Sequence, residues 1–202
     1  MEEIDPARTA VLCVHWQHEV VSPDGLFGPL FADQVARHHV ASHAARVAAA
    51  VRTGGGSVVY TRVAHRPGYP DLIPNTPAFA LIRQRNAFLE GAPKTRIIDE
   101  VAPQSGDVVI THVRLSGFFG TDLDTILRAR GVQTVLFTGV ATNLSITGTA
   151  YEAVNHGYRI VTVSDACTAA TDDAHRASLA TLGQLGPVVS TDDVVRRLTG
   201  GP

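Results

Sequence analysis

Short apolar runs alternate along the chain with longer segments whose apolar residues recur at helical spacing. The apolar runs predict six buried strands, at residues 10–14, 57–62, 107–111, 134–138, 159–163 and 188–190. The helical spacing predicts helices over residues 31–53, 121–130, 142–156, 172–182 and 192–198. Strands and helices that alternate in this way are typical of parallel pairing with right-handed crossovers. The pattern therefore predicts an α/β fold, a three-layer doubly wound sandwich with a mainly parallel six-stranded sheet.

Length and composition predict one globular domain spanning residues 1–202. Apolar residues make up 45% of the chain and charged residues 18%, which is typical of a folded protein. The net charge of −2 gives no basic surface for nucleic acid, and the apolar runs are too short to span a membrane. Residues 1–8 do not resemble a secretion signal, and both cysteines lie in apolar segments. We expect a cytoplasmic protein with reduced thiols.

The order of the strands also predicts where a ligand binds. In doubly wound sheets the ligand lies beyond the carboxyl ends of the strands. The residues just past the first, third and fourth strands are 15–19, 112–118 and 139–145. The loop after the second strand, which belongs to a proline-rich and irregular stretch over residues 63–106, adds Arg62, His65 and Arg66. These segments are the candidates for a site.

Four blocks of sequence in and around these segments resemble the isochorismatase-like hydrolases. V-L-C-V-H-W-Q-H-E-V at 11–20 resembles the first-strand motif of that family, L-L-V-I-D-M-Q-N-D-F. V-V-I-T-H-V-R-L-S-G-F-F-G-T-D-L at 108–123 resembles its K-x-x-x-S-A-F-x-G-T-D-L block. T-G-V-A-T-N-L-S-I-T-G-T-A at 138–150 and G-Y-R-I-V-T-V-S-D-A-C at 157–167 resemble the two blocks that follow. The order and spacing match over nearly the whole chain.

The resemblance implies a site with unusual residues. Family members that hydrolyse C–N bonds use an Asp, a Lys and a Cys nucleophile, and these positions correspond here to His15, His112 and Ser145. The family also places a cis peptide between the residues that match Val140 and Ala141. That turn directs backbone N–H groups, here of Ala141 and Ser145, at a developing oxyanion. The resemblance further implies a homo-oligomer.

No metal or other cofactor is predicted. The metal-binding Asp-x-His motif of some family members has no match here, because the residue two positions before His65 is not an Asp. A metal held by His15 and His112 would need a third ligand, for which His18 is the nearest candidate.

Three interpretations of His15, His112 and Ser145 compete. Ser145 is a nucleophile activated by one of the histidines, with Glu19 as the nearest acid to orient the base. Alternatively, the histidines act as general acid and base on a bound substrate, and Ser145 only forms a hydrogen bond. In the third interpretation the chain is a pseudoenzyme that serves binding or assembly. We favour an enzyme that acts on a small polar molecule.

Five further side chains are candidate substrate contacts. Trp16 and Phe118 are predicted to form apolar walls, and Gln17 is predicted to form hydrogen bonds near the first strand end. Arg62 and His65 are predicted to hold a substrate carboxylate.

Overall fold

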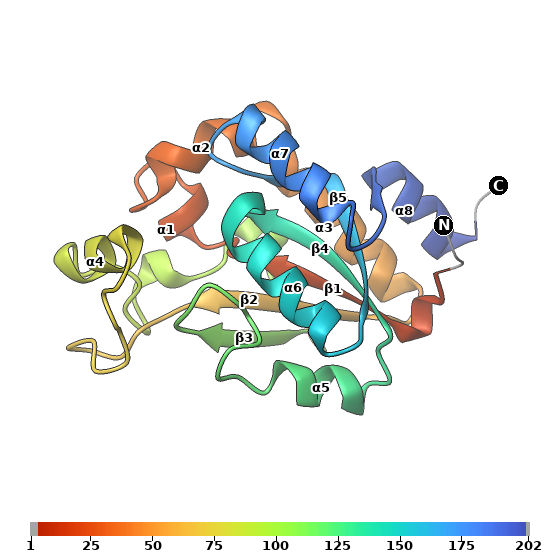
Figure 1. The fold of residues 1–202 in the computed structure, drawn as a ribbon, viewed down its shortest axis with the longest axis horizontal. Coiled ribbons are helices and arrows are strands. Elements are labelled where there is room, and N and C mark those ends of the chain that lie inside the picture. Colours follow the sequence, from red (N-terminus) through yellow and green to blue (C-terminus); the bar gives the residue numbers. More distant parts are fainter. Residues whose placement is uncertain (1–3, 201–202) are drawn as a thin grey trace.

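Six strands form one parallel sheet in the order β3-β2-β1-β4-β5-β6 (Figure 1). The structure is a computed structural model, and it describes residues 4–200. The strands are β1 (Thr9–Val14), β2 (Ser57–Val63), β3 (Val108–His112), β4 (Thr134–Val140), β5 (Arg159–Thr168) and β6 (Val188–Val189). This architecture confirms the predicted α/β fold, and the described sheet is parallel throughout.

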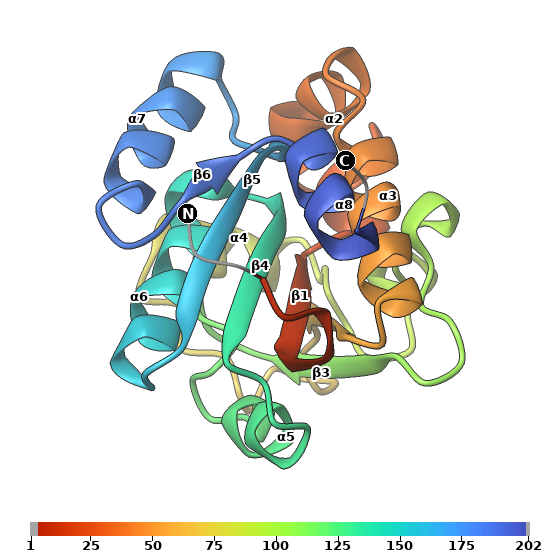
Figure 2. The ribbon, with the colours of Figure 1, turned by 90° about the vertical axis from the view of Figure 1, so that its right-hand side faces the viewer.

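Helices cover both faces of the sheet (Figure 2). The helices on one face are α2 (Gly28–Arg37), α3 (Val40–Thr53) and α8 (Thr191–Thr199). Those on the other are α5 (Leu123–Ala129), α6 (Thr147–Asn155) and α7 (Asp172–Leu182). Strand β1 supplies both cores, because alternate side chains of a strand point to opposite faces. Val11 and Cys13 pack under α3, whereas Leu12 and Val14 pack in the cluster under α5 and α6.

Two predicted helices have different boundaries in the structure. The segment predicted as one helix over 31–53 forms α2 and α3, because His39 between them adopts a left-handed conformation with φ of 51°. The helix predicted over 142–156 begins with a π-helical turn, Thr142–Ile146, and continues as α6. The first difference explains why a continuous apolar pattern does not guarantee a continuous helix.

The proline-rich segment after β2 contains a helix that the sequence pattern did not predict. Helix α4 (Pro77–Gln84) begins after Thr76, whose hydroxyl accepts a hydrogen bond from the backbone N–H of Phe79 at 3.2 Å. A threonine cap followed by proline at the first helical position is a favourable helix start. Short 3-10 turns, Pro93–Thr95 and Asp99–Val101, follow α4, and another, Pro6–Arg8, precedes β1.

Two helices lie at the end of the molecule toward which the strands point. These are the short α1 (His18–Val21) and α4, and both are visible at the carboxyl edge of the sheet in Figure 1. This arrangement covers the edge where ligands bind in doubly wound sheets. Within residues 4–200, no helix has the length and apolar character needed to cross a membrane.

Candidate active site

His15 is positioned by the close approach of β1 and β4. It follows β1 with a left-handed backbone, φ 57°, and its N–H donates to the carbonyl of Thr61 in β2 at 3.0 Å. Val14 pairs with Gly139 of β4, and a Cβ atom at Gly139 would lie only 2.1 Å from the Val14 carbonyl oxygen. Glycine is therefore required at this position. The approach places His15 beside the turn that follows β4.

His15 and His112 form a buried pair. Their Nε2 atoms are 2.8 Å apart, and the rings are stacked with centroids 4.9 Å apart. The Nδ1–H of His112 donates to the carbonyl oxygen of Arg114 at 2.8 Å, because a carbonyl can only accept. Nε2 of a neutral His112 must then accept, so Nε2–H of His15 donates. In the neutral pair, the remaining lone pair is on Nδ1 of His15.

Burial keeps this pair neutral at pH 7. Desolvation lowers the pKa of His15 well below its usual value, and the neighbouring His112 lowers it further. Desolvation also lowers the pKa of His112 to about 4, although the hydrogen bond to the Arg114 carbonyl partly opposes this shift. Both imidazoles are thus neutral, and the lone pair that is free to accept a proton is the one on His15.

Ser145 lies in the π-helical turn that follows the cis peptide bond between Val140 and Ala141. Its carbonyl accepts a hydrogen bond from the Thr149 hydroxyl at 2.6 Å. The same hydroxyl oxygen accepts from the N–H of Gly117 at 3.1 Å, which ties the turn to the loop after β3. The Ser145 hydroxyl makes no hydrogen bond with any other residue in the described part of the chain. It is therefore available to a substrate.

His15, Ser145, Val140 and Ala141 line one cavity of about 150 Å³. The other lining residues come from α1 and the loop after it, from α2, from the end of β2, from α4 and the loop after it, from the loop after β3 and from the π-helical turn. They are Val20, Phe27, Leu30, Phe31, Val63, Ala78, Phe79, Ile82, Phe88, Arg114, Leu115 and Leu144. His112 contacts His15 but does not line the cavity. The arrangement has a base, a hydroxyl and an irregular backbone turn at one small cavity.

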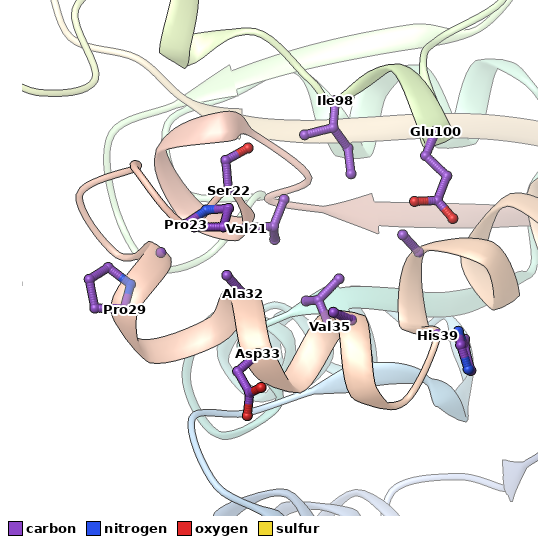
Figure 3. A pocket seen from close by; sticks show the side chains of 13 residues that line it. Val21, Ser22, Pro23, Pro29, Ala32, Asp33, Val35, His39, Ile98 and Glu100 are labelled. Carbon is purple, nitrogen blue, oxygen red and sulfur yellow. The ribbon is translucent and has the colours of Figure 1, made fainter.

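A second cavity, of about 610 Å³, lies between α2 and the loop around Ile98 (Figure 3). Its titratable residues are Asp33, His39 and Glu100, all of them exposed. Asp33 pairs with Arg37 on the same helix, and neither histidine of the buried pair is present. We place the candidate site at the smaller cavity, because buried and perturbed titratable groups mark active sites more reliably than volume does.

The structure places Trp16 and Gln17 away from this cavity. Trp16 is fully buried in the core under α3. The Gln17 side chain donates to the carbonyls of Val63 and Thr95 and accepts from the N–H of Val63. Neither side chain lines this cavity, because the chain turns at His15 and directs the following side chains into the protein, and their contact with a substrate stays a prediction.

Three other side chains that were predicted to contact substrate also lie outside this cavity. The Arg62 side chain donates to the Thr111 hydroxyl at 3.0 Å. His65 is fully buried, with Nδ1 3.2 Å from the carboxylate of Asp71. Phe118 packs in the cluster on the opposite face of the sheet and stacks on His156. None of these three side chains lines the cavity.

Glu19 does not orient either histidine. Its carboxylate accepts from the N–H of Leu26 at 2.9 Å and thereby fixes the loop after α1. The residue that orients His15 is His112. Because the two are separated by 97 positions, only their places at the carboxyl ends of β1 and β3, on either side of β2 in the sheet, indicate that they meet.

Arg114 is a site residue that the sequence pattern did not single out. Its carbonyl orients His112, and its guanidinium donates to Asn75 Oδ1 at 3.0 Å and to the carbonyl of Ile73 at 3.3 Å. The guanidinium also lies 4.7 Å from the centre of the Phe79 ring. Arg114 thus connects the histidine pair to the cavity wall on α4. Its position within residues 112–118, just past the third predicted strand, was the available signal.

The described residues do not assemble a metal site. Among residues 4–200, no group of three or more His, Cys, Asp or Glu side chains is arranged to hold a metal ion. His18, the candidate third ligand, instead has its Nδ1 2.9 Å from the Ser22 hydroxyl.

The fold and this site define a class, a parallel α/β protein with a buried histidine pair beside a small cavity at the carboxyl edge. The family model of the isochorismatase domain matches residues 9–193, and the chain belongs to this family. It is 31% identical over 192 residues to the ureidoacrylate amidohydrolase RutB of Methylobacterium radiotolerans, covering 89% of this chain and 74% of that protein. It is 29% identical to the maleamate amidohydrolase of Pseudomonas putida, and this match covers 95% of this chain and 87% of that protein.

Solved structures show the same architecture. A cysteine hydrolase from Pseudomonas syringae pv. phaseolicola superposes with a TM-score of 0.90 at 29% identity, covering 99% of this chain and 96% of that one. The N-carbamoylsarcosine amidase of Thermoplasma acidophilum superposes with a TM-score of 0.75 at 30% identity, and the superposition covers 92% of this chain and 97% of that one.

Proposed function

We propose that this chain is a hydrolase that cleaves a C–N or ester bond of a small molecule, with His15, His112 and Ser145 in place of the Asp, Lys and Cys of its family. The amidohydrolase relatives support the reaction class. The observation that carries the proposal is the 2.8 Å contact between the histidines, which leaves a base lone pair on His15.

The chemistry follows from the hydrogen bonds of the pair. His15 is the general base, and His112 orients it in the way that a carboxylate orients the histidine of a serine hydrolase. The Ser145 oxygen attacks the acyl carbon while its proton passes to His15. That proton then goes to the leaving amine or alcohol as the C–N or C–O bond breaks. Water attacks the acyl-serine, its proton passes through His15, and the free acid and Ser145 are regenerated.

Two further features support Ser145 as the nucleophile. The cysteines of the chain, Cys13 and Cys167, are both buried, and burial raises the pKa of each thiol above its usual value, that of Cys13 to about 12. A buried thiol of high pKa is a poor nucleophile. In addition, Ala141 lines the cavity with Ser145, and we assign the N–H groups of these two residues to the developing oxyanion.

The competing route has the same base and a different nucleophile. In that route His15 activates a water molecule that attacks the substrate directly, and Ser145 only donates a hydrogen bond. The free hydroxyl of Ser145 favours this route as a second candidate, because no base contacts it before substrate binds.

Acyl transfer from p-nitrophenyl esters separates these routes. We expect mass spectrometry to find an acyl adduct on Ser145, and we expect Ser145→Ala to abolish the adduct and turnover. Ser42→Ala, at an exposed serine of α3, is the matched control and should behave as wild type. Turnover that survives in Ser145→Ala but not in His15→Ala identifies the water route. Absence of turnover across ester and amide panels would instead support the binding-protein alternative.

A further inference from the structure

We infer that the group held in the cavity beside Ser145 is an uncharged apolar acyl group about the size of one six-membered ring. This inference rests on the proposed function, because it names the substrate class of the same site. It departs from the small polar substrate that the sequence alone predicts.

The cavity walls supply the first argument. The deep walls are Phe88, Phe79 and Ile82, with 1%, 4% and 3% of their surface exposed. Among the residues that line the cavity, His15, Ser145 and Arg114 are the ones with polar side chains. The first two belong to the proposed chemistry, so the rest of the wall offers a substrate mainly hydrophobic contact. A polar acyl group would lose its hydration there without gaining hydrogen bonds.

Arg114 is the residue that most directly favours the opposite conclusion, a substrate carboxylate. However, its guanidinium already donates to Ile73 and Asn75, neither of which lines the cavity. It also stacks on Phe79. These bonds use two of the five N–H donors of the guanidinium, and a substrate carboxylate would pair with the remaining donors beside the apolar Phe79 ring, where it loses hydration. The arrangement therefore favours Arg114 as a brace for α4 rather than as a carboxylate receptor.

Size and access supply the second argument. An apolar cavity of roughly this volume in another protein holds one benzene molecule. Three exposed leucines, Leu30, Leu115 and Leu144, also line this cavity, with 52%, 43% and 50% of their surface exposed. Exposed apolar side chains gathered around an opening mark a binding site for apolar groups. The apolar surface thus continues from solvent to the deep wall.

A series of p-nitrophenyl esters tests the inference. The acyl groups are acetyl, butyryl, benzoyl, 2-naphthoyl and 4-carboxybenzoyl, and each kcat/KM is divided by the rate of uncatalysed hydrolysis. We expect benzoyl to exceed acetyl by about tenfold or more, since a methylene in a fitted pocket changes kcat/KM by about tenfold. We expect kcat/KM for the 4-carboxybenzoyl ester to be about 100-fold below that for the benzoyl ester, because its charge is desolvated. We expect kcat/KM for the 2-naphthoyl ester also to be below that for the benzoyl ester, because the naphthyl ring is larger than the cavity.

Two alanines on α4 provide a matched pair of variants. Ala78 lines the cavity, whereas Ala80 is exposed on the same helix. Ala78→Leu narrows the cavity and should lower the benzoyl-to-acetyl ratio about tenfold. Ala80→Leu should leave the ratio unchanged, and both substitutions should cost the helix little, because leucine is also a strong helix former.

Binding experiments separate failure of this inference from failure of the proposed hydrolysis. Ligand-observed NMR measures the binding of benzamide and of 4-carboxybenzamide to the wild type and to the Ala78→Leu and Ala80→Leu variants. Benzamide binding that Ala78→Leu weakens supports the apolar cavity even if no ester is turned over. Turnover that favours acetyl or 4-carboxybenzoyl overturns the substrate class and leaves the hydrolase proposal standing. Absence of both turnover and benzamide binding contradicts both.

Discussion

His15 and His65 are both buried histidines that follow neighbouring parallel strands, yet their environments differ. Nε2 of His15 contacts another imidazole, and His15 lines a cavity. Nδ1 of His65 contacts the carboxylate of Asp71, while its N–H and carbonyl bond to the backbone around Phe88 and Glu90. Desolvation lowers the pKa of both, but Asp71 partly restores that of His65.

The difference separates a proposed chemical role from a structural one. A carboxylate partner favours a proton on His65, and the backbone hydrogen bonds of His65 hold the loop after β2 against the segment that carries Phe88. A histidine partner that is itself tied to a carbonyl leaves His15 with a lone pair at a cavity. Burial and a shifted pKa therefore do not distinguish the two residues. The identity of the hydrogen-bond partner does.

The largest expected effect is on catalysis. Under the proposed function, His15→Asn should lower kcat/KM by about 10²–10⁴-fold, which is the usual contribution of general base catalysis. His65→Asn should change it by less than about threefold, because His65 does not touch the cavity. Steady-state kinetics on the best ester measure both, and circular dichroism checks that each variant is folded. Comparable losses in two folded variants would remove the distinction between the histidines.

The fold was predictable because its signals repeat along the chain. Six strands and several helices each contribute evidence, so errors at single boundaries do not alter the architecture. The helix over 172–182 matches α7. Helix α4 was missed because eight residues in a proline-rich stretch carry too little periodicity. The single domain over 1–202, the cytoplasmic location and the homo-oligomer stay predictions.

The site was only partly predictable, for a physical reason. His15 and His112 follow strands whose carboxyl ends meet at one edge, so their proximity was expected. Their tautomers were not, because these depend on the Arg114 carbonyl. The burial of Trp16 outside the cavity has a similar origin, since the left-handed backbone of His15 ends the alternation of the strand. Such backbone reversals leave little trace in the sequence when the residue is not glycine.

The pH dependence of stability is the next effect in size. The pKa of His112 is about 6.5 when unfolded and about 4 when folded, so the unfolded chain binds the extra proton between these values. Stability from this group is therefore complete above pH 6.5 and lost as the pH falls toward 4. Between pH 7 and pH 5 the loss is about 2 kcal/mol.

Urea denaturation at the two pH values measures this loss. His15 contributes in the same direction, because its pKa is also lowered. His112→Asn should reduce the difference between the two pH values by about 2 kcal/mol, whereas Ser42→Asn, at an exposed serine, should leave it as in wild type. An unchanged pH difference in His112→Asn would show that this residue does not titrate as a neutral buried base.

The smallest effect concerns Asp71. Its carboxylate accepts from the backbone N–H of Arg66 at 3.1 Å and lies 3.2 Å from Nδ1 of His65. Asp71→Asn replaces a charged acceptor by a neutral one and should cost about 1 kcal/mol of unfolding free energy. It should leave kcat/KM unchanged, because the loop remains in place and the cavity does not include these residues. Asp99→Asn, at an exposed acid, is the control for loss of charge. A large loss of kcat/KM in a stable Asp71→Asn variant would place His65 in the chemistry, and the contrast with His15 would then fail.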